Sequence, residues 1–223
     1  MSSSKAKERN RAAQRSKAPS TRPAPRRSSV IAALLVVAIA GLLLAIYLAN
    51  RSSSTSNASS AFQVGSPGPG KAAPPIQLTA TDGSTFDLIH ERGKNVLLYF
   101  QEGVGCEPCW TQITDIQSHR DSFTAMHVDE IVSITTNPMD QLRQKVNDEH
   151  ITIPVLSDPD LSVSTAYNAN RYGMMGTSAD GHTFVLVGPD GRIRWRADYG
   201  GEPNYTMYVP VDRLLAELRK ASP

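Results

Sequence analysis

The stretch GVGCEPCWTQI, residues 103–113, holds both cysteines of this 223-residue chain, Cys106 and Cys109. The residues directly ahead, 95–100, predict a buried strand, and the apolar spacing after the cysteines predicts a helix. Cys106 is therefore expected at a strand-to-helix turn. The N-terminus of such a helix presents unpaired backbone N–H groups, which favour a thiolate at the first cysteine. Pro108 suits the first helical turn, where its missing N–H costs nothing.

A Cys-x-x-Cys pair fits a redox dithiol, half of a zinc site, or two unrelated core thiols. Structural zinc needs four ligands, and none of the five histidines forms the close pair that would complete the set. Two inert core thiols suit the interior of a strand or helix better than a turn with Gly105 before it and Pro108 inside it. The pattern favours the redox dithiol, and it predicts no metal and no cofactor.

Charge divides the chain into unlike parts. Residues 1–29 carry nine Lys or Arg and one acid, whereas residues 50–223 carry fourteen basic and twenty acidic residues, so the net charge of +2 is the sum of +8 and −6. Residues 30–49 between them hold no charge and are rich in Leu, Ile, Val and Ala. A helix of this length spans about 30 Å, the thickness of a bilayer core.

Residues 30–49 predict an uncleaved transmembrane helix, since the apolar run is longer than that of a cleaved signal peptide. The basic arm, residues 1–29, is expected to be disordered and to stay in the cytoplasm, because positive flanks are retained there. This places the cysteines outside the cytoplasm, in a single-pass protein of the cell membrane. The arm has no aromatic residue to stack on bases, so no nucleic-acid partner is predicted.

Residues 50–74 are rich in Ser, then in Pro and Gly, and predict a flexible linker. The globular pattern begins at Pro75 and continues to residue 223. The expected strands are 76–80, 85–88, 96–101, 130–134, 153–156, 183–187 and 193–198, and the expected helices are 111–123, 139–149, 162–167 and 211–220. This order predicts an α/β domain with a central mixed sheet flanked by helices.

Residues 72–223 resemble the thioredoxin-like superfamily, in its AhpC/TSA and TlpA/ResA-like branch of membrane-anchored redoxins. The resemblance is carried by the strand before the cysteine turn, by Cys-Glu-Pro-Cys at 106–109, by Leu-Ser-Asp-Pro at 156–159, and by residues 183–191. It implies a thioredoxin-like fold and a redox-active Cys106–Cys109 disulfide. Cys106 would attack and Cys109 would resolve.

Further site residues follow from the resemblance and from position. Glu107, Pro108 and Trp110 are expected to tune the site, and Gly181, His182 and Thr183 form a possible docking loop. This loop departs from thioredoxins, which place a cis-proline here. Peroxiredoxins place Thr or Ser three residues before the attacking cysteine, and this chain has Gly103.

The leading function is a membrane-anchored thiol-disulfide oxidoreductase. Its expected partners are protein disulfides or dithiols outside the cytoplasm and an electron-donating thiol partner, membrane-bound or soluble. One alternative is a peroxiredoxin-type thiol peroxidase that uses the same cysteines. A second is a copper carrier that uses Cys106, Cys109 and His182, since thiolates with imidazole suit copper.

Overall fold

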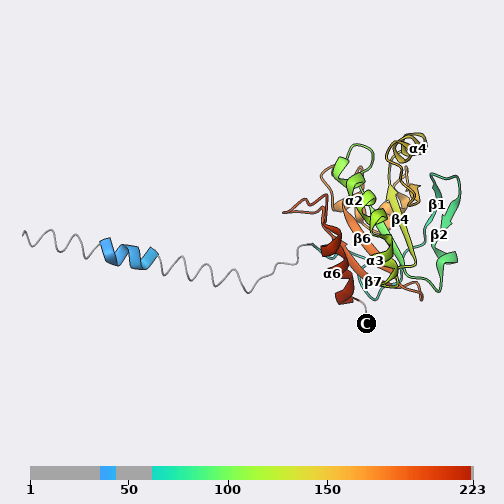
Figure 1. Cartoon of the computed structure of the whole chain (residues 1–223). Coiled ribbons are helices and arrows are strands. Elements are labelled where there is room, and N and C mark those ends of the chain that lie inside the picture. Colours follow the sequence, from blue (N-terminus) through green and yellow to red (C-terminus); the bar gives the residue numbers. More distant parts are fainter. Residues whose placement is uncertain (1–35, 44–61, 222–223) are drawn as a thin grey trace, which may run out of the picture. The chain divides into compact units, whose positions relative to one another are not determined.

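The computed structural model describes residues 36–43 and 62–221 (Figure 1). The chain divides into two units, residues 1–58 and 59–223. In the first unit, residues 36–43 form a helix. The basic arm and most of the segment expected to cross the membrane lie outside the described residues. Among the residues that are described, no helix combines the length and apolarity that crossing a bilayer requires.

The second unit is built on a seven-stranded sheet in the order β2-β1-β5-β4-β3-β6-β7. The strands are β1 (Gln77–Ala80), β2 (Thr85–Asp87), β3 (Val96–Phe100), β4 (Glu130–Thr135), β5 (Val155–Ser157), β6 (Thr183–Val187) and β7 (Ile193–Asp198). Strand β3 pairs in parallel with β4 and antiparallel with β6. All five residues of β3 are buried, as expected for a run of apolar residues at the centre of a covered sheet.

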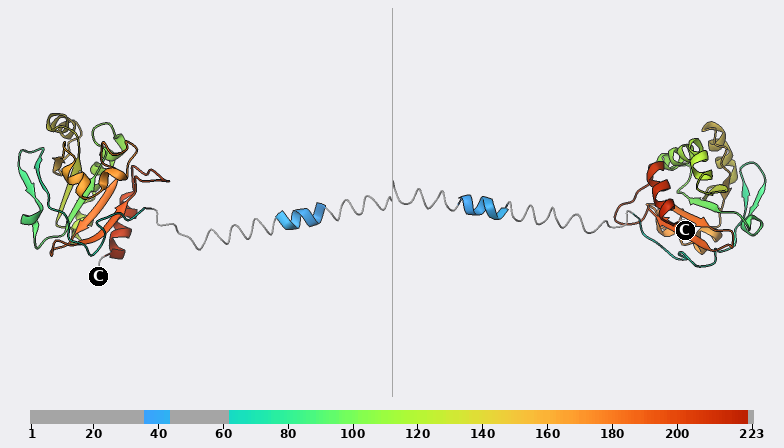
Figure 2. Two further views of the ribbon diagram at one scale, coloured as in Figure 1. Left: turned by 180° about the vertical axis from the view of Figure 1, so that it is seen from behind. Right: turned by 60° about the horizontal axis from the view of Figure 1, so that its bottom comes forward.

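Helices cover both faces of the sheet (Figures 1 and 2). They are η1 (Leu88–Glu91), α2 (Glu107–Ser118), α3 (Arg120–Thr124), α4 (Met139–Asp148), α5 (Ser162–Ala166), η2 (Ala169–Arg171) and α6 (Val211–Ala221). Side chains of α2, α3, α4 and α6 share one core cluster with Leu97 and Tyr99 of β3. Residues of α5 and η2 share the opposite cluster with Leu98 and Phe100. The alternation along β3 thus divides its side chains between two cores.

The helix expected after the cysteines begins between them, at Glu107, four residues earlier than expected, and ends at Ser118. Pro108 lies in its first turn, so the missing N–H leaves no hydrogen bond unmade. A second helix, α3, follows around His119, which caps the end of α2 and the start of α3. The expected single helix, 111–123, is therefore two helices.

Part of the expected linker, residues 62–73, forms what we term the N-terminal strap. The strap runs antiparallel along β7, with Gln63 opposite Asp198 and Ala72 opposite Arg192. Backbone hydrogen bonds join the two segments near each of these pairs. The folded part of the chain thus extends ahead of Pro75.

A buried ion pair helps to hold the strap. Arg196 and Asp198 of β7 are both fully buried, and Arg196 Nη2 lies 2.9 Å from Asp198 Oδ1. The backbone N–H of Gly65 donates to Asp198 Oδ2 at 2.6 Å. The ring of Phe62 packs edge-on against Trp195 at 6.0 Å. Buried charges need such partners, so the strap satisfies groups that the domain alone would leave incomplete.

Candidate active site

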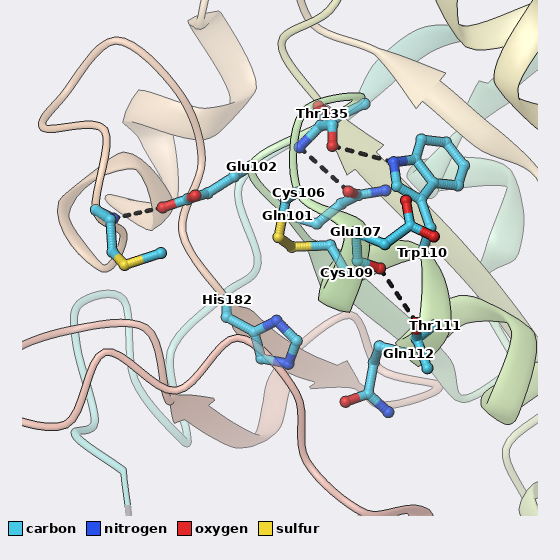
Figure 3. Close-up of a disulfide and its surroundings, with 12 residues drawn as sticks. Gln101, Glu102, Cys106, Glu107, Cys109, Trp110, Thr111, Gln112, Thr135 and His182 are labelled. Carbon is cyan, nitrogen blue, oxygen red and sulfur yellow. Dashed lines mark hydrogen bonds between the residues drawn. A yellow bond between two sulfur atoms is a disulfide. The ribbon is translucent and has the colours of Figure 1, made fainter.

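Cys106 and Cys109 lie at the start of α2 and are joined by a disulfide, with their Cα atoms 5.3 Å apart (Figure 3). Cys106 is the N-cap residue of the helix, and its carbonyl accepts the backbone N–H of Cys109 at 3.0 Å. Cys106 is 8% exposed, whereas Cys109 is fully buried. Of the two cysteines, only Cys106 has any surface exposed to solvent.

Gly103 fixes the turn that leads into the helix. Its backbone has φ +96°, a left-handed conformation that favours glycine. Its carbonyl accepts hydrogen bonds from the backbone N–H of Cys106 and from Trp110 Nε1, each at 3.0 Å. A Cβ atom at this position would overlap Asn137 Oδ1 and lie 2.7 Å from Thr135 Oγ1. The turn thus excludes any side chain at the position where peroxiredoxins carry Thr or Ser.

Glu107 and Pro108, two of the residues expected to tune the site, are exposed. The Glu107 carboxylate pairs with Lys145 Nζ of α4 at 3.1 Å. Lys145 also binds Glu149, and hydrogen bonds to Glu149 and then Glu107 raise the pKa of Lys145 above its ordinary value, although burial opposes this. The negative charge beside Cys106 is therefore partly neutralised by a lysine from another helix.

Trp110 is fully buried in the core beneath the cysteine turn. Its indole N–H donates to the Gly103 carbonyl, as noted above, and Lys145 Nζ lies 5.7 Å from its ring centre. The side chain connects the helix to the loop that precedes Cys106. Trp110 therefore acts on the shape of the turn and does not face solvent.

The structure buries all three residues of the possible docking loop, Gly181, His182 and Thr183. Gly181 packs against the Tyr172 backbone so closely that a Cβ atom would overlap it. Thr183 Oγ1 donates to the Asp198 carboxylate at 2.8 Å. These three residues are therefore part of the buried interior and offer no exposed side chain for docking.

His182 lies near the cysteine pair (Figure 3), and Tyr99 bridges His182 and the backbone of Cys109. The Tyr99 hydroxyl lies 3.0 Å from His182 Nδ1 and 3.5 Å from the Cys109 carbonyl oxygen. Burial lowers the pKa of His182 to about 3. Burial, together with the negative charge of Glu102, raises the pKa of Tyr99 well above 10.0. Both groups are therefore neutral at physiological pH.

The sequence analysis did not identify Tyr99, Gln112 or Met207 as site residues. Met207 forms a small apolar cluster with the two cysteines. Gln112, one helical turn after Cys109, accepts the Val209 N–H at 2.7 Å through Oε1. A polar side chain at a buried helical position was the available signal for Gln112, and the hydroxyl in an otherwise apolar strand was the signal for Tyr99. Nothing local in sequence indicates Met207.

The described residues hold no group of three or more His, Cys, Asp or Glu side chains arranged to bind a metal ion. His182 is fully buried and its Nδ1 atom is engaged by Tyr99. The copper-carrier alternative gains no support from this geometry.

Comparison with known proteins places the chain in a family. The model described as AhpC/TSA family matches residues 69–196, more than half of the chain. Two relatives from Mycobacterium tuberculosis are named "Putative peroxiredoxin MT2597" (strain CDC 1551 / Oshkosh) and "Putative peroxiredoxin Rv2521" (strain ATCC 25618 / H37Rv). Each is 34% identical over 131 residues, which is 56% of this chain and 81% of the relative.

Solved structures share the fold. Mycobacterium tuberculosis AhpC gives a TM-score of 0.58 at 20% identity, covering 70% of this chain and 98% of its own. Enterococcus faecalis AhpC gives 0.59 at 14% identity, covering 69% and 91%. These similarities confirm the expected thioredoxin-like α/β fold. With the matched family and the cysteine pair at the helix start, the chain belongs to the AhpC/TSA family and is a thiol-dependent oxidoreductase.

Proposed function

We propose that the chain is a thiol-disulfide oxidoreductase in which Cys106 attacks and Cys109 resolves. The Cys106 thiolate opens a disulfide in a partner and forms a mixed disulfide with it. The Cys109 thiolate then attacks Cys106 Sγ, and the partner leaves as a thiol. The second step is intramolecular, and this proximity makes it fast.

The observation that supports this proposal is the unequal exposure of Cys106 and Cys109, whose sulfurs are bonded to each other. Cys106 is slightly exposed at the helix N-terminus, where the helix dipole favours a thiolate. Cys109 is fully buried, so an outside disulfide does not reach it. This asymmetry suits an attacking thiol and a resolving thiol.

A thiol peroxidase is the second candidate, because the M. tuberculosis relatives are named as peroxiredoxins. Cys106 would reduce a hydroperoxide, become a sulfenic acid and condense with Cys109 to release water. The geometry at Gly103 weighs against this candidate, since the turn has no room for the hydroxyl-bearing side chain found there in peroxiredoxins.

The proposed location is the outer side of the cell membrane, with residues 30–49 as anchor and residues 1–29 in the cytoplasm. The charge asymmetry about the apolar run supports this orientation. The proposed partners are protein disulfides or dithiols outside the cytoplasm and a thiol protein that supplies electrons. In that compartment the redox state of the pair depends on such partners and not on cytosolic glutathione.

The decisive experiment replaces Cys109 with Ser in the full-length protein in cells. Cys106 can still open a partner disulfide, but no neighbouring thiol remains to expel the partner, so a protein adduct should accumulate and disappear with reductant. The Cys106→Ser, Cys109→Ser double variant gives the background. A peroxidase would instead leave Cys106 as a sulfenic acid that a dimedone-type reagent traps after peroxide. Dimedone labelling without any protein adduct would replace the leading function with the second.

Topology has its own test. Protease added outside spheroplasts should remove residues 62–223 and leave the basic arm protected. Release of an intact domain into the medium would show cleavage near residue 49 and would contradict the anchor. Protection of the domain until the membrane is permeabilised would place it in the cytoplasm and contradict the location.

A further inference from the structure

We propose that Met207 determines which of the two cysteines attacks, by covering Cys109 and keeping it in the thiol form. This inference rests on the proposed function, in which Cys106 attacks and Cys109 resolves. The thiolate and not the thiol is the nucleophile in disulfide exchange, so the less ionised and less accessible cysteine is the poorer attacker. A side chain that hides one cysteine and not the other therefore sets the order of the two steps.

Cys109 depends on a small group of side chains for its burial. It is fully buried, yet within the described chain it belongs to neither of the two large core clusters. It groups instead with Cys106 and Met207 in a separate apolar cluster. Cys106 is its disulfide partner, so Met207 is the member of this cluster that comes from another segment. Met207 is 7% exposed and thus lies at the boundary between the cluster and solvent.

Hydrogen bonds on both sides of Met207 hold its segment. Before it, the Thr206 backbone N–H donates to the carbonyl of the residue after β7 at 3.0 Å. After it, the Val209 N–H donates to Gln112 Oε1 of α2 at 2.7 Å. Gln112 follows Cys109 by about one helical turn, so this bond brings the segment alongside the start of α2.

The tip of the Met207 side chain lies beside Gly200. A Cβ atom at Gly200 would lie 3.1 Å from Met207 Cε and 2.7 Å from the His182 backbone nitrogen, and it would overlap the Tyr172 carbonyl oxygen. The backbone at Gly200 therefore comes close to the Met207 tip. An unbranched thioether side chain suits such irregular space.

The helix start and the apolar cover act on the cysteines in opposite directions. Cys106 is the N-cap residue of α2 and keeps some exposure, so the helix dipole and solvent both favour its thiolate. Cys109 lies in the first turn, and its position on the helix alone would favour a thiolate there too. Burial among apolar groups disfavours a thiolate, because the charge loses its water. The apolar cover therefore separates the two cysteines.

The titratable groups nearest the cysteine pair in the described chain are Tyr99, His182, Glu102 and Glu107. Tyr99 and His182 are neutral at physiological pH, as described above. Glu107 is exposed and paired with a lysine, and Glu102 accepts a backbone N–H from a neighbouring loop. The ionisation of Cys109 is therefore left mainly to burial and to the helix N-terminus.

The first step then takes place at Cys106 alone. The Cys106 thiolate bonds to one sulfur of the partner disulfide, the S–S bond of the partner breaks, and its other sulfur leaves with the electron pair as a thiolate. Cys109 keeps its proton through this step. It becomes the nucleophile only in the second step, when the mixed disulfide on Cys106 has formed beside it.

The experiment measures alkylation by iodoacetamide against pH in reduced full-length protein, with one cysteine present at a time. Cys106→Ser leaves Cys109 as the sole thiol, and Cys109→Ser leaves Cys106, since the chain has two cysteines. At pH 7 Cys106 should label at least about tenfold faster than Cys109, which corresponds to a difference of about one pH unit between the midpoints of their labelling profiles.

Met207→Ala should speed the labelling of Cys109 by about tenfold at pH 7 and lower the pH midpoint of its profile, because water reaches the sulfur. Labelling of Cys106 should change less than about twofold, since Cys106 keeps its exposure and its place at the helix start. Met207→Leu conserves apolar volume and should keep the labelling of Cys109 slow. Met126→Ala is the matched control, because Met126 is a partly buried methionine that packs on a different cluster.

The proposed function has a separate readout. Reduced Cys109→Ser with Met207 intact should form a mixed disulfide with 5,5′-dithiobis(2-nitrobenzoate) and release a coloured thiolate. Absence of this release would overturn the proposed function, whatever Met207 does. Release of the thiolate, together with unchanged labelling of Cys109 in Met207→Ala, would overturn the role of Met207 alone.

Three results would overturn the role of Met207. One is an unchanged rate and midpoint for Cys109 in folded Met207→Ala. Another is equal speeding of both cysteines, which would indicate general loosening of the domain, and the third is a Met207→Leu variant that behaves like Met207→Ala. If Met207→Ala does not fold, Met207→Gln decides, because a polar amide of similar length should lower the pH midpoint for Cys109. An unchanged midpoint there would equally overturn the proposal.

Discussion

The Asn137 side chain occupies the space that a side chain at Gly103 would need. Asn137 Oδ1 accepts the Val104 backbone N–H at 2.9 Å and the Thr135 hydroxyl at 3.2 Å, so it is held in place from two directions. The loop after β4 therefore sets the shape of the loop after β3. This contact connects the turn ahead of Cys106 to a part of the chain about thirty residues away.

The Gly103 turn gives the first prediction. Gly103→Ala should lower the free energy of unfolding by about 2–4 kcal/mol, because it combines a left-handed backbone with an overlap against Asn137. Denaturant unfolding measures the change. Gly105→Ala in the same turn is the control, since a Cβ atom there meets nothing within 4 Å. Equal stability of the two variants would contradict the packing described here.

A second prediction concerns charge beside Cys106. In a Cys109→Ser background, Glu107→Gln should speed alkylation of Cys106 and Lys145→Gln should slow it, because one removes a negative charge and the other leaves it uncompensated. Exposed pairs are worth at most about 1 kcal/mol, so each change should stay within about fivefold and shrink in high salt. Lys94→Gln, which removes an exposed pair with Glu91 on η1, is the control. Changes of the same sign in both variants would refute the electrostatic explanation.

The third prediction concerns Asp180. Its carboxyl group is buried, and burial and then the nearby Asp158 raise its pKa well above 3.8, although a hydrogen bond from Ser164 opposes this. Ser164 Oγ lies 2.5 Å from Asp158 Oδ2 and 3.0 Å from Asp180 Oδ2. One hydroxyl proton cannot serve two carboxylates, so a proton on Asp180 completes the cluster.

The raised pKa of Asp180 sets the direction in which stability depends on pH. A raised folded-state pKa means that the stability contributed by this proton is present below about pH 4 and is lost as pH rises through the folded pKa. Asp180→Asn should therefore flatten the stability profile above pH 4 and raise the free energy of unfolding at pH 7 by about 1 kcal/mol or more. The exposed Asp190, whose pKa is lowered mainly by the Arg192 N–H, should show the opposite trend when changed to Asn. A loss of stability at pH 7 in Asp180→Asn would mean that Asp180 is ionised and well paired.

A fourth prediction tests the N-terminal strap. Phe62→Ala should lower the free energy of unfolding by about 1–2 kcal/mol, since this half-buried ring packs on Trp195 and Tyr199. A chain that begins at Pro75 should lose more, because it also removes the Gly65 N–H from the buried Asp198 carboxylate. Thermal unfolding of chains that begin at residues 59 and 75 makes the comparison. Equal midpoints would show that the strap is dispensable.

Much of the fold could be predicted from local pattern. The all-apolar run at β3 and the Pro-Asp-Gly turn between β6 and β7 place two elements directly, and each strand expected from the sequence matches one in the sheet. The sequence pattern also indicated that Cys106 would lie just ahead of the first turn of the helix. These features depend on residues close together in sequence, which is why periodicity and turn chemistry identify them.

The rest depends on contacts between distant residues. The strap looked like a flexible linker because five of its twelve residues are Gly or Pro, and its contacts with the distant strand β7, including the buried pair Arg196 and Asp198, explain why it folds. The arrangement of Tyr99, His182 and Cys109 joins three segments and leaves no local sequence pattern. The overlap that excludes a side chain at Gly103 likewise comes from Asn137, and the sequence of the cysteine turn gives no sign of it.

The position of the strap also bears on how partners can bind. Strand β7 ends the sheet on one side, and an uncovered edge strand would invite pairing with strands of other proteins. The strap pairs with that edge near both of its ends, and the opposite edge is β2, a strand of three residues. Binding of a partner by β-strand addition is therefore disfavoured at both edges of the sheet. Under the proposed function, a partner disulfide would have to be presented from a loop or a chain terminus, close to Cys106.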